Sequence, residues 1–177
     1  MTSSEERPIA LVGLMGAGKS AVAHALGERL GTAVADLDAM VEAESGSTIA
    51  GLFARAGEPA FRRLEGRILE QALVAGAGVI ACGGGIVLDP AHRRSLVERC
   101  RVVWLEVEPA TAARRLAGVA ATRPLLGGAA AAPRLAALLA ERRPLYAGVA
   151  DVRVSVEGRT PDEVAVAVLR ALRERAG

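Results

Sequence analysis

Short apolar runs alternate with longer segments of helical periodicity along most of the chain. The apolar runs predict five short strands, at residues 9–12, 32–35, 78–82, 101–107 and 151–156. Helical spacing of apolar positions predicts helices between them, at residues 21–30, 39–45, 48–56, 59–75, 109–117 and 133–146, with further helices beginning near 90 and 161. This alternation predicts an α/β fold with a mostly parallel sheet covered by helices on both faces, which is a three-layer arrangement.

Capping residues mark the ends of several predicted helices. Gly31 is a suitable C-cap for the first helix, and Ser47 is a suitable N-cap for the helix at 48–56. Asp89, which a proline follows, predicts another helix start. Thr160 and Glu163 have the spacing of a capping box, so a C-terminal amphipathic helix is expected to begin there.

Two segments depart from the alternation of strands and helices. Three successive helices without an intervening strand, divided by Gly46 and Gly57, indicate an insertion that begins near residue 38. The segment from 118 to 133 loses its periodicity and contains two adjacent glycines and an alanine run, as a mobile flap would.

Size and composition favour one domain, residues 1–177, because 177 residues with 51% hydrophobic content can bury one sizeable core. A net charge of +2 and only 2% aromatic residues argue against a nucleic-acid surface. Cys82 and Cys100 have no C-x-x-C spacing, and the polar start of the chain does not look like a secretory leader, so we expect a cytoplasmic protein. Glycines interrupt the longest uncharged stretch, residues 71–88, so we expect no membrane span. We also expect a monomer.

Residues 13–20, GLMGAGKS, match the phosphate-loop pattern G-x-x-x-x-G-K-[ST] in full. The motif lies between a predicted strand and a predicted helix, so glycine N–H groups and the helix N-terminus are available to an anion. Lys19, the only lysine of the chain, is expected to reach the β- and γ-phosphates, and Ser20 to offer a hydroxyl to Mg²⁺. The loop therefore predicts a protein that binds a nucleoside triphosphate.

The phosphate loop alone does not decide the reaction, because many enzyme classes share it. A GTPase would need an N-K-x-D element, and the only lysine is already part of the loop. Glu106 in the fourth strand is a possible Walker B carboxylate, although a solvated or capping glutamate fits strand alternation equally well.

Other candidate residues each have two physical interpretations. Arg62 and Glu65, three apart on a helix, either hold a guanidinium ready for a carboxylate ligand or form an ordinary surface pair. The triple glycine at 83–85 either lets a ligand approach the backbone closely or is a flexible turn. Asp38, near the end of the second strand, either contacts a ligand or caps a helix. Phe53 and Phe61 fit an apolar wall or the core, while both histidines, His24 and His92, and both cysteines are expected to be ordinary structural residues.

Several separated motifs accompany the phosphate loop: Asp36-x-Asp38, Phe61-Arg62-Arg63-Leu64-Glu65, Gly83-Gly84-Gly85, Arg123-Pro124-Leu125-Leu126 and Arg142-Arg143-Pro144-Leu145-Tyr146. In order and spacing, from about residue 8 to 173, they resemble shikimate kinase, within the nucleoside monophosphate kinase-like group. The resemblance implies a P-loop kinase fold with a helical substrate-binding insertion at about 38–66 and a mobile lid at about 117–133. It also implies transfer of the γ-phosphate of ATP to the 3-hydroxyl of shikimate, in the pathway to chorismate and the aromatic amino acids.

The resemblance assigns roles to individual residues. It implies ATP binding by Gly16, Ala17, Gly18, Lys19, Ser20, Ala21, Arg115, Arg123, Arg159 and Pro161. Arg115 and Pro161 would sandwich adenine, although a basic helix end facing solvent is an alternative for Arg115. It implies shikimate binding by Asp38, Arg62, Gly83, Gly84, Gly85 and Arg142. Ser20 and Asp36 would hold Mg²⁺, the implied cofactor, and the catalytic residues would be Lys19, Asp38 and Arg123.

Two departures from the usual family pattern concern Ala21, where a hydroxyl residue is common, and Cys82, which precedes the triple glycine. The first predicts a missing contact to the α-phosphate, and the second is expected to be harmless packing.

The resemblance makes shikimate and ATP the expected partners. A gluconate kinase of the same group and a nucleotide-binding regulatory module without turnover are the alternatives.

Overall fold

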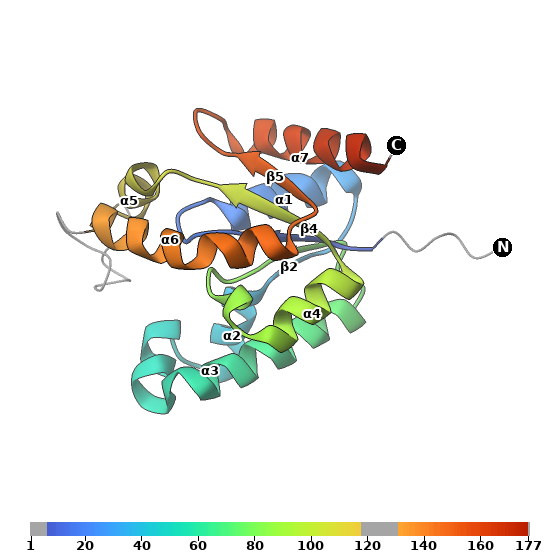
Figure 1. Cartoon of the computed structure of the whole chain (residues 1–177). Helices are drawn as coiled ribbons and strands as arrows, with labels where there is room; N and C mark the ends of the chain where they lie inside the picture. Colours follow the sequence, from blue (N-terminus) through green and yellow to red (C-terminus); the bar gives the residue numbers. More distant parts are fainter. Residues whose placement is uncertain (1–6, 118–130, 177) are drawn as a thin grey trace.

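The computed structural model describes residues 7–117 and 131–176 (Figure 1). Within these ranges the strands are β1 (Ile9–Val12), β2 (Val34–Asp36), β3 (Val79–Ala81), β4 (Arg101–Glu106) and β5 (Val152–Ser155). The helices are α1 (Lys19–Leu30), α2 (Leu37–Ser45), α3 (Ile49–Val74), α4 (Pro90–Arg99), α5 (Pro109–Ala117), α6 (Ala131–Val149) and α7 (Pro161–Ala176), with a 3₁₀ turn η1 (Ile86–Leu88). The predicted strands and helices are therefore confirmed where they fall in the described residues.

The five strands form one parallel sheet in the order β2-β3-β1-β4-β5. Strand β1 lies at the centre, and all four of its residues are fully buried, as expected for a strand covered on both faces. Helices α1 and α7 pack together on one side of the sheet, whereas α4 and α6 pack against β4 from the other side (Figure 1). This confirms the predicted α/β fold with its sheet between helical layers.

The helical segment after β2 is built as two helices, α2 and a long α3 that bends. At Gly57 the backbone leaves the helical region, with φ 77° and ψ 171°, so the glycine predicted to divide two helices produces a kink. The predicted N-cap at Ser47 is wrong by one residue. Thr48 has the extended backbone of a cap, and its hydroxyl accepts a hydrogen bond from the N–H of Gly51 at 3.1 Å.

The other predicted caps are confirmed. Gly31 ends α1 in the left-handed conformation, and the Asp89 carboxylate accepts a hydrogen bond from the Ala91 N–H at the start of α4. The Thr160 hydroxyl accepts from the Glu163 N–H, and the Glu163 carboxylate accepts from the Thr160 N–H, which is the reciprocal pattern of a capping box.

The predicted lid at 117–133 lies mostly in residues 118–130, which are outside the described part of the chain, and so does Arg123. The described helices α5 and α6 bound this segment and pack against each other. Among the helices that are described, none is both long enough and apolar enough to span a bilayer.

Close packing of α1 on β2 yields a test of the fold. Gly27 lies inside α1, and a Cβ there would overlap Cγ2 of Val34 and lie 3.2 Å from the Thr32 carbonyl oxygen. Helix propensity alone would favour alanine by about 1 kcal/mol, but overpacking costs about 1–3 kcal/mol. We therefore expect Gly27→Ala to lower the free energy of unfolding by up to about 2 kcal/mol, measured by denaturant titration.

Gly148 provides the matched control, because it is exposed in α6 and no atom lies within 4 Å of a Cβ placed on it. Gly148→Ala should stabilise the protein by roughly 0.5–1 kcal/mol. Equal effects of the two substitutions would contradict the described packing of α1 on β2.

Candidate active site

Most of the predicted site residues that the structure describes follow strands that end at one edge of the sheet, because parallel strands end on the same side. The phosphate loop follows β1, Asp36 ends β2, and the triple glycine follows β3. Strands β2 and β1 both pair with β3, so these three segments are neighbours. Helix α3 supplies Arg62, and α6 supplies Arg142.

The phosphate loop is shaped by backbone that glycine alone adopts without strain. Gly13 has φ 141°, and a Cβ there would overlap the carbonyl oxygen of Leu105 in β4. Gly18 caps α1 without a side-chain hydrogen bond, so the first N–H groups of this helix are not capped by a side chain. The Lys19 ammonium donates to the carbonyl oxygens of Gly13 and Leu14 at 2.8 and 3.0 Å. The loop is therefore folded around its own lysine, with a helix N-terminus suited to phosphate.

Ser20 and Asp36 are brought together across the sheet edge, as predicted for a magnesium site. The Ser20 hydroxyl donates to Oδ2 of Asp36 at 2.5 Å, and Oδ1 of Asp36 accepts from the Ala39 N–H at 3.2 Å. Asp36 is thus the N-cap of α2, whereas Asp38, for which capping was the alternative, lies in the first turn. A hydroxyl and a carboxylate are the oxygen ligands that Mg²⁺ uses beside phosphate and water, so these residues fit the ion.

The triple glycine accommodates side chains of the protein itself. A Cβ on Gly83 would lie 2.8 Å from Oδ1 of Asp38 and 2.9 Å from Oε1 of Glu65, so two carboxylates converge on this residue. A Cβ on Gly85 would overlap the guanidinium of Arg62. The sequence predicted close approach by a ligand, and the structure adds that Asp38, Glu65 and Arg62 already approach this backbone.

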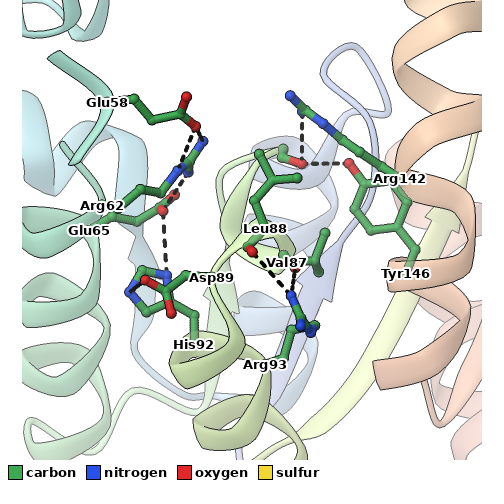
Figure 2. Close-up of polar contacts among 11 residues, drawn as sticks. Glu58, Arg62, Glu65, Val87, Leu88, Asp89, His92, Arg93, Arg142 and Tyr146 are labelled. Atoms are coloured by element: carbon green, nitrogen blue, oxygen red, sulfur yellow. Dashed lines mark hydrogen bonds and ion pairs between the residues drawn. The ribbon is translucent and has the colours of Figure 1, made fainter.

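Arg62 is held in a partly buried position by two glutamates. Its Nη1 donates to Oε2 of Glu65 at 2.6 Å, and Nε and Nη2 donate to Glu58 at 3.3 and 3.2 Å (Figure 2). The guanidinium also lies 5.0 Å from the ring centroid of Phe61, which in turn packs against Phe53 in a tilted arrangement. The predicted Arg62–Glu65 pair is confirmed, and the buried side chain of Glu65 excludes an ordinary surface pair.

Glu65 is one of the few buried charged residues, with 1% of its surface exposed. Burial raises the pKa of Glu65, although Arg62 acts in the opposite direction. Its Oε1 has no hydrogen-bond partner among the described residues. Because an unpaired carboxylate oxygen is costly inside a protein, this group depends on the cations and donors around it.

Arg142 approaches the triple glycine from the side opposite Arg62. Its Nη1 donates to the carbonyl oxygen of Gly84 at 3.2 Å, and the Tyr146 hydroxyl donates to the same oxygen at 2.5 Å. Figure 2 shows Arg62 and Arg142 on different helices, with the segment after β3 between them. The arrangement can therefore place two guanidinium groups around one small anionic ligand.

The residues predicted to bind the base occupy the other end of the site. Nη1 of Arg115 donates to the carbonyl oxygens of Gly16 and Ala17 at 3.2 and 3.3 Å, so α5 lies against the phosphate loop. Arg159 donates to the Ser155 carbonyl oxygen at 2.9 Å. Pro161 begins α7, and Ala21 is exposed in the first turn of α1.

Glu106, the possible Walker B residue, forms ion pairs with Arg143 and Arg153 at 3.4 and 3.6 Å. Both arginines also lie over the ring of Trp104, the buried tryptophan of β4. This engagement supports the structural interpretation of Glu106. Both cysteines are buried, as predicted for core residues, and burial raises the pKa of Cys100 to about 11.

Sequence reasoning missed two supporting residues of the site. His92 was expected to be an ordinary helix-face residue, but it is buried, with Nδ1 3.6 Å from Oε2 of Glu65. Arg93 donates to the carbonyl oxygens of Val87 and Leu88 at 2.6 and 3.2 Å, which fixes the turn after the triple glycine (Figure 2). A lone histidine in a polar helix carries no periodic signal, so only the tertiary contact reveals it. His24, by contrast, is an exposed helix residue as expected.

Comparison with known proteins agrees with this geometry. The sequence profile described as shikimate kinase matches residues 15–173. The chain is 44% identical over 168 residues to a shikimate kinase of Symbiobacterium thermophilum, covering 94% of this chain and 97% of the relative. It is 46% identical over 167 residues to a shikimate kinase of Thermobifida fusca, covering 94% and 95% of the two chains.

A solved structure of similar fold is the shikimate kinase of Acinetobacter baumannii in complex with shikimate. The TM-score is 0.89 at 32% identity, and the match covers 96% of this chain and 94% of that one. Profile, relatives and structure agree over nearly the whole length of the protein, and on these grounds the chain belongs to the shikimate kinase family.

Proposed function

We propose that this protein transfers the γ-phosphoryl group of ATP to the 3-hydroxyl of shikimate, giving shikimate 3-phosphate and ADP. The observation that carries the proposal is the pair of arginines, Arg62 and Arg142, on opposite sides of a glycine triplet that adjoins the phosphate loop. Two fixed guanidinium groups suit a carboxylate, and the glycines leave room for a ring between the carboxylate and the phosphates.

Arg62 is proposed to bind the shikimate carboxylate. Glu65 and Glu58 hold its guanidinium, so little side-chain freedom is lost when the ligand arrives. Arg142 is proposed to complete the carboxylate site from α6, and its contact with the Gly84 carbonyl keeps it near the triplet. The glycines at 83, 84 and 85 are proposed to line the ring.

Asp38 is proposed to hold the 3-hydroxyl and to accept its proton. Its carboxylate lies beside Gly83, at the end of the site that adjoins β1 and the phosphate loop. The hydroxyl oxygen forms a bond to the γ-phosphorus, the bond from that phosphorus to the β-bridging oxygen breaks, and ADP leaves.

The phosphate half of the site is proposed to act by charge neutralisation. When ATP binds, Lys19 is proposed to leave the loop carbonyl oxygens and to donate to the transferred phosphate instead. Residues 16–21 are proposed to surround the phosphates of ATP. Ser20 and Asp36 are proposed to hold Mg²⁺, the ion directly through Ser20 and its waters through Asp36. Bound Mg²⁺ would neutralise charge on the phosphates.

Three further arginines are proposed to serve ATP. Arg115 and Pro161 would enclose adenine, with Arg159 nearby, because Arg115 already borders the phosphate loop. Arg123 is proposed to neutralise the transferring group from the lid. We further propose one domain over residues 1–177, with the substrate-binding insertion at about 38–66 and the lid at about 117–133, acting as a cytoplasmic monomer in aromatic amino acid biosynthesis.

A coupled ADP-release assay tests the reaction. With ATP and Mg²⁺ we expect rapid release of ADP with shikimate and little with gluconate, because open-chain gluconate does not hold a hydroxyl at the fixed distance from its carboxylate that the shikimate ring imposes. Chelation of Mg²⁺ should abolish release, since phosphate charge would then be poorly neutralised. Equal rates with both acids, or none with shikimate, would contradict the proposal.

Arg62→Ala tests the carboxylate site. Loss of charge-assisted hydrogen bonds worth about 3 kcal/mol should raise the KM for shikimate roughly 100-fold. The Kd for ATP, measured by titration calorimetry, should change less than about twofold, because Arg62 is not part of the phosphate loop.

Arg63→Ala is the matched control, since Arg63 is the exposed neighbour of Arg62 on the same helix. It should leave the KM for shikimate within about twofold of the unsubstituted protein. If both alanine variants weaken shikimate binding equally, the assignment of Arg62 is wrong.

A further inference from the structure

His92 is a buried histidine beside the proposed substrate site with no role in the reaction proposed above. It lies in the first turn of α4, only 7% exposed, and its ring enters the contact between α4 and α3. A Cβ on Gly66 would lie 2.5 Å from Nε2 of His92, so the imidazole rests on the backbone of α3 one residue after Glu65. Any larger residue at position 66 would displace the ring.

The ring faces carboxylates at both of its nitrogens. Nδ1 lies 3.6 Å from Oε2 of Glu65, and Nε2 lies 3.9 Å from Oδ2 of Asp89. Asp89 is partly exposed and already caps α4, whereas Glu65 is buried. The Glu65 carboxylate therefore has the greater need of a second donor.

The polar atoms of this contact have unused hydrogen-bonding capacity. Nδ1 of His92 and Oε1 of Glu65 are both buried, and neither has a hydrogen-bond partner in the described residues. Nδ1 lies 3.6 Å from Oε2 of Glu65, a few tenths of an ångström beyond a hydrogen bond, so the two groups are in close contact without being hydrogen-bonded in this structure. Burial lowers the pKa of His92, so the ring is neutral at neutral pH and carries a single N–H, which faces the Glu65 carboxylate when it is on Nδ1.

Glu65 has a polar neighbour on each side, Arg62 and His92. Arg62 donates to Oε2 at 2.6 Å, and Figure 2 shows the carboxylate between Arg62 and His92. A carboxylate that contacts only the Arg62 guanidinium could rotate together with that guanidinium. A second donor restricts the orientation of the carboxylate plane. The orientation of Arg62 then depends on both groups.

We propose that His92 is a positioning residue for shikimate binding, which orients the Glu65 carboxylate and through it the guanidinium of Arg62. This inference rests on the proposed role of Arg62. It does not place His92 in contact with substrate. Its effect should therefore fall on the affinity for shikimate and spare the transfer step.

Asparagine and leucine at position 92 make a matched pair, because they have the same shape and only asparagine carries a donor near the position of Nδ1. We expect His92→Asn to keep the KM for shikimate within about twofold, and His92→Leu to raise it about tenfold, as loss of one hydrogen bond implies. For both variants kcat and the KM for ATP should stay within about twofold.

Coupling to Glu65 distinguishes positioning from general packing. In a protein that already carries Glu65→Gln, adding His92→Leu should raise the KM for shikimate less than about twofold. The reason is that the carboxylate through which His92 acts is already absent. Thermal unfolding of each variant reports structural damage separately. If His92→Leu does not fold, His92→Gln replaces it, since the glutamine amide reaches the position of Nε2 and leaves Nδ1 without a substitute.

The outcomes separate this inference from the proposed reaction. Equal KM values for the asparagine and leucine variants, a full leucine effect in the Glu65→Gln background, or an equal rise in the KM for ATP would each overturn the role of His92. Absence of shikimate turnover in the unsubstituted protein would instead overturn the proposed function.

Discussion

A buried carboxylate is stable in a protein only when cations and hydrogen-bond donors replace the water it has lost. Glu65 is such a group, and much of the proposed substrate site is arranged around it. Arg62 supplies the charge at 2.6 Å, Gly83 leaves space for Oε1, and His92 fills the side toward α4. Removing one partner of a buried ion pair costs about 3–5 kcal/mol, so the loss of either Arg62 or Glu65 would destabilise this part of α3.

The parallel sheet supplies the second constraint, since it brings distant segments to one edge. Three neighbouring strands are followed by the phosphate loop, Asp36 and the glycine triplet. The strand order alone therefore brings these segments together. The glycines then let side chains come close. Arg62 and Arg142 approach the triplet from α3 and α6, so the spacing of these helices sets the distance between the arginines.

Local patterns predicted most of this arrangement. The phosphate loop, the Arg62–Glu65 pair and the strand that ends at Asp36 each have a signal within a few residues, and the strands and helices were found to within a few positions. Asp36 rather than Asp38 proved to be the helix cap, because α2 begins at Leu37, two residues earlier than predicted. His92 and the contacts of the Gly84 carbonyl oxygen could not be predicted, since they join residues far apart in the chain.

Two arginines on opposite sides of the glycine triplet are proposed to bind the acid group, while Asp38 holds the hydroxyl that receives phosphate. A crystal structure of the protein with shikimate, ADP and Mg²⁺ tests it most directly. We expect the carboxylate of shikimate between Arg62 and Arg142, and the 3-hydroxyl within hydrogen-bonding distance of Asp38. A carboxylate bound away from Arg62, or a different hydroxyl at Asp38, would contradict it.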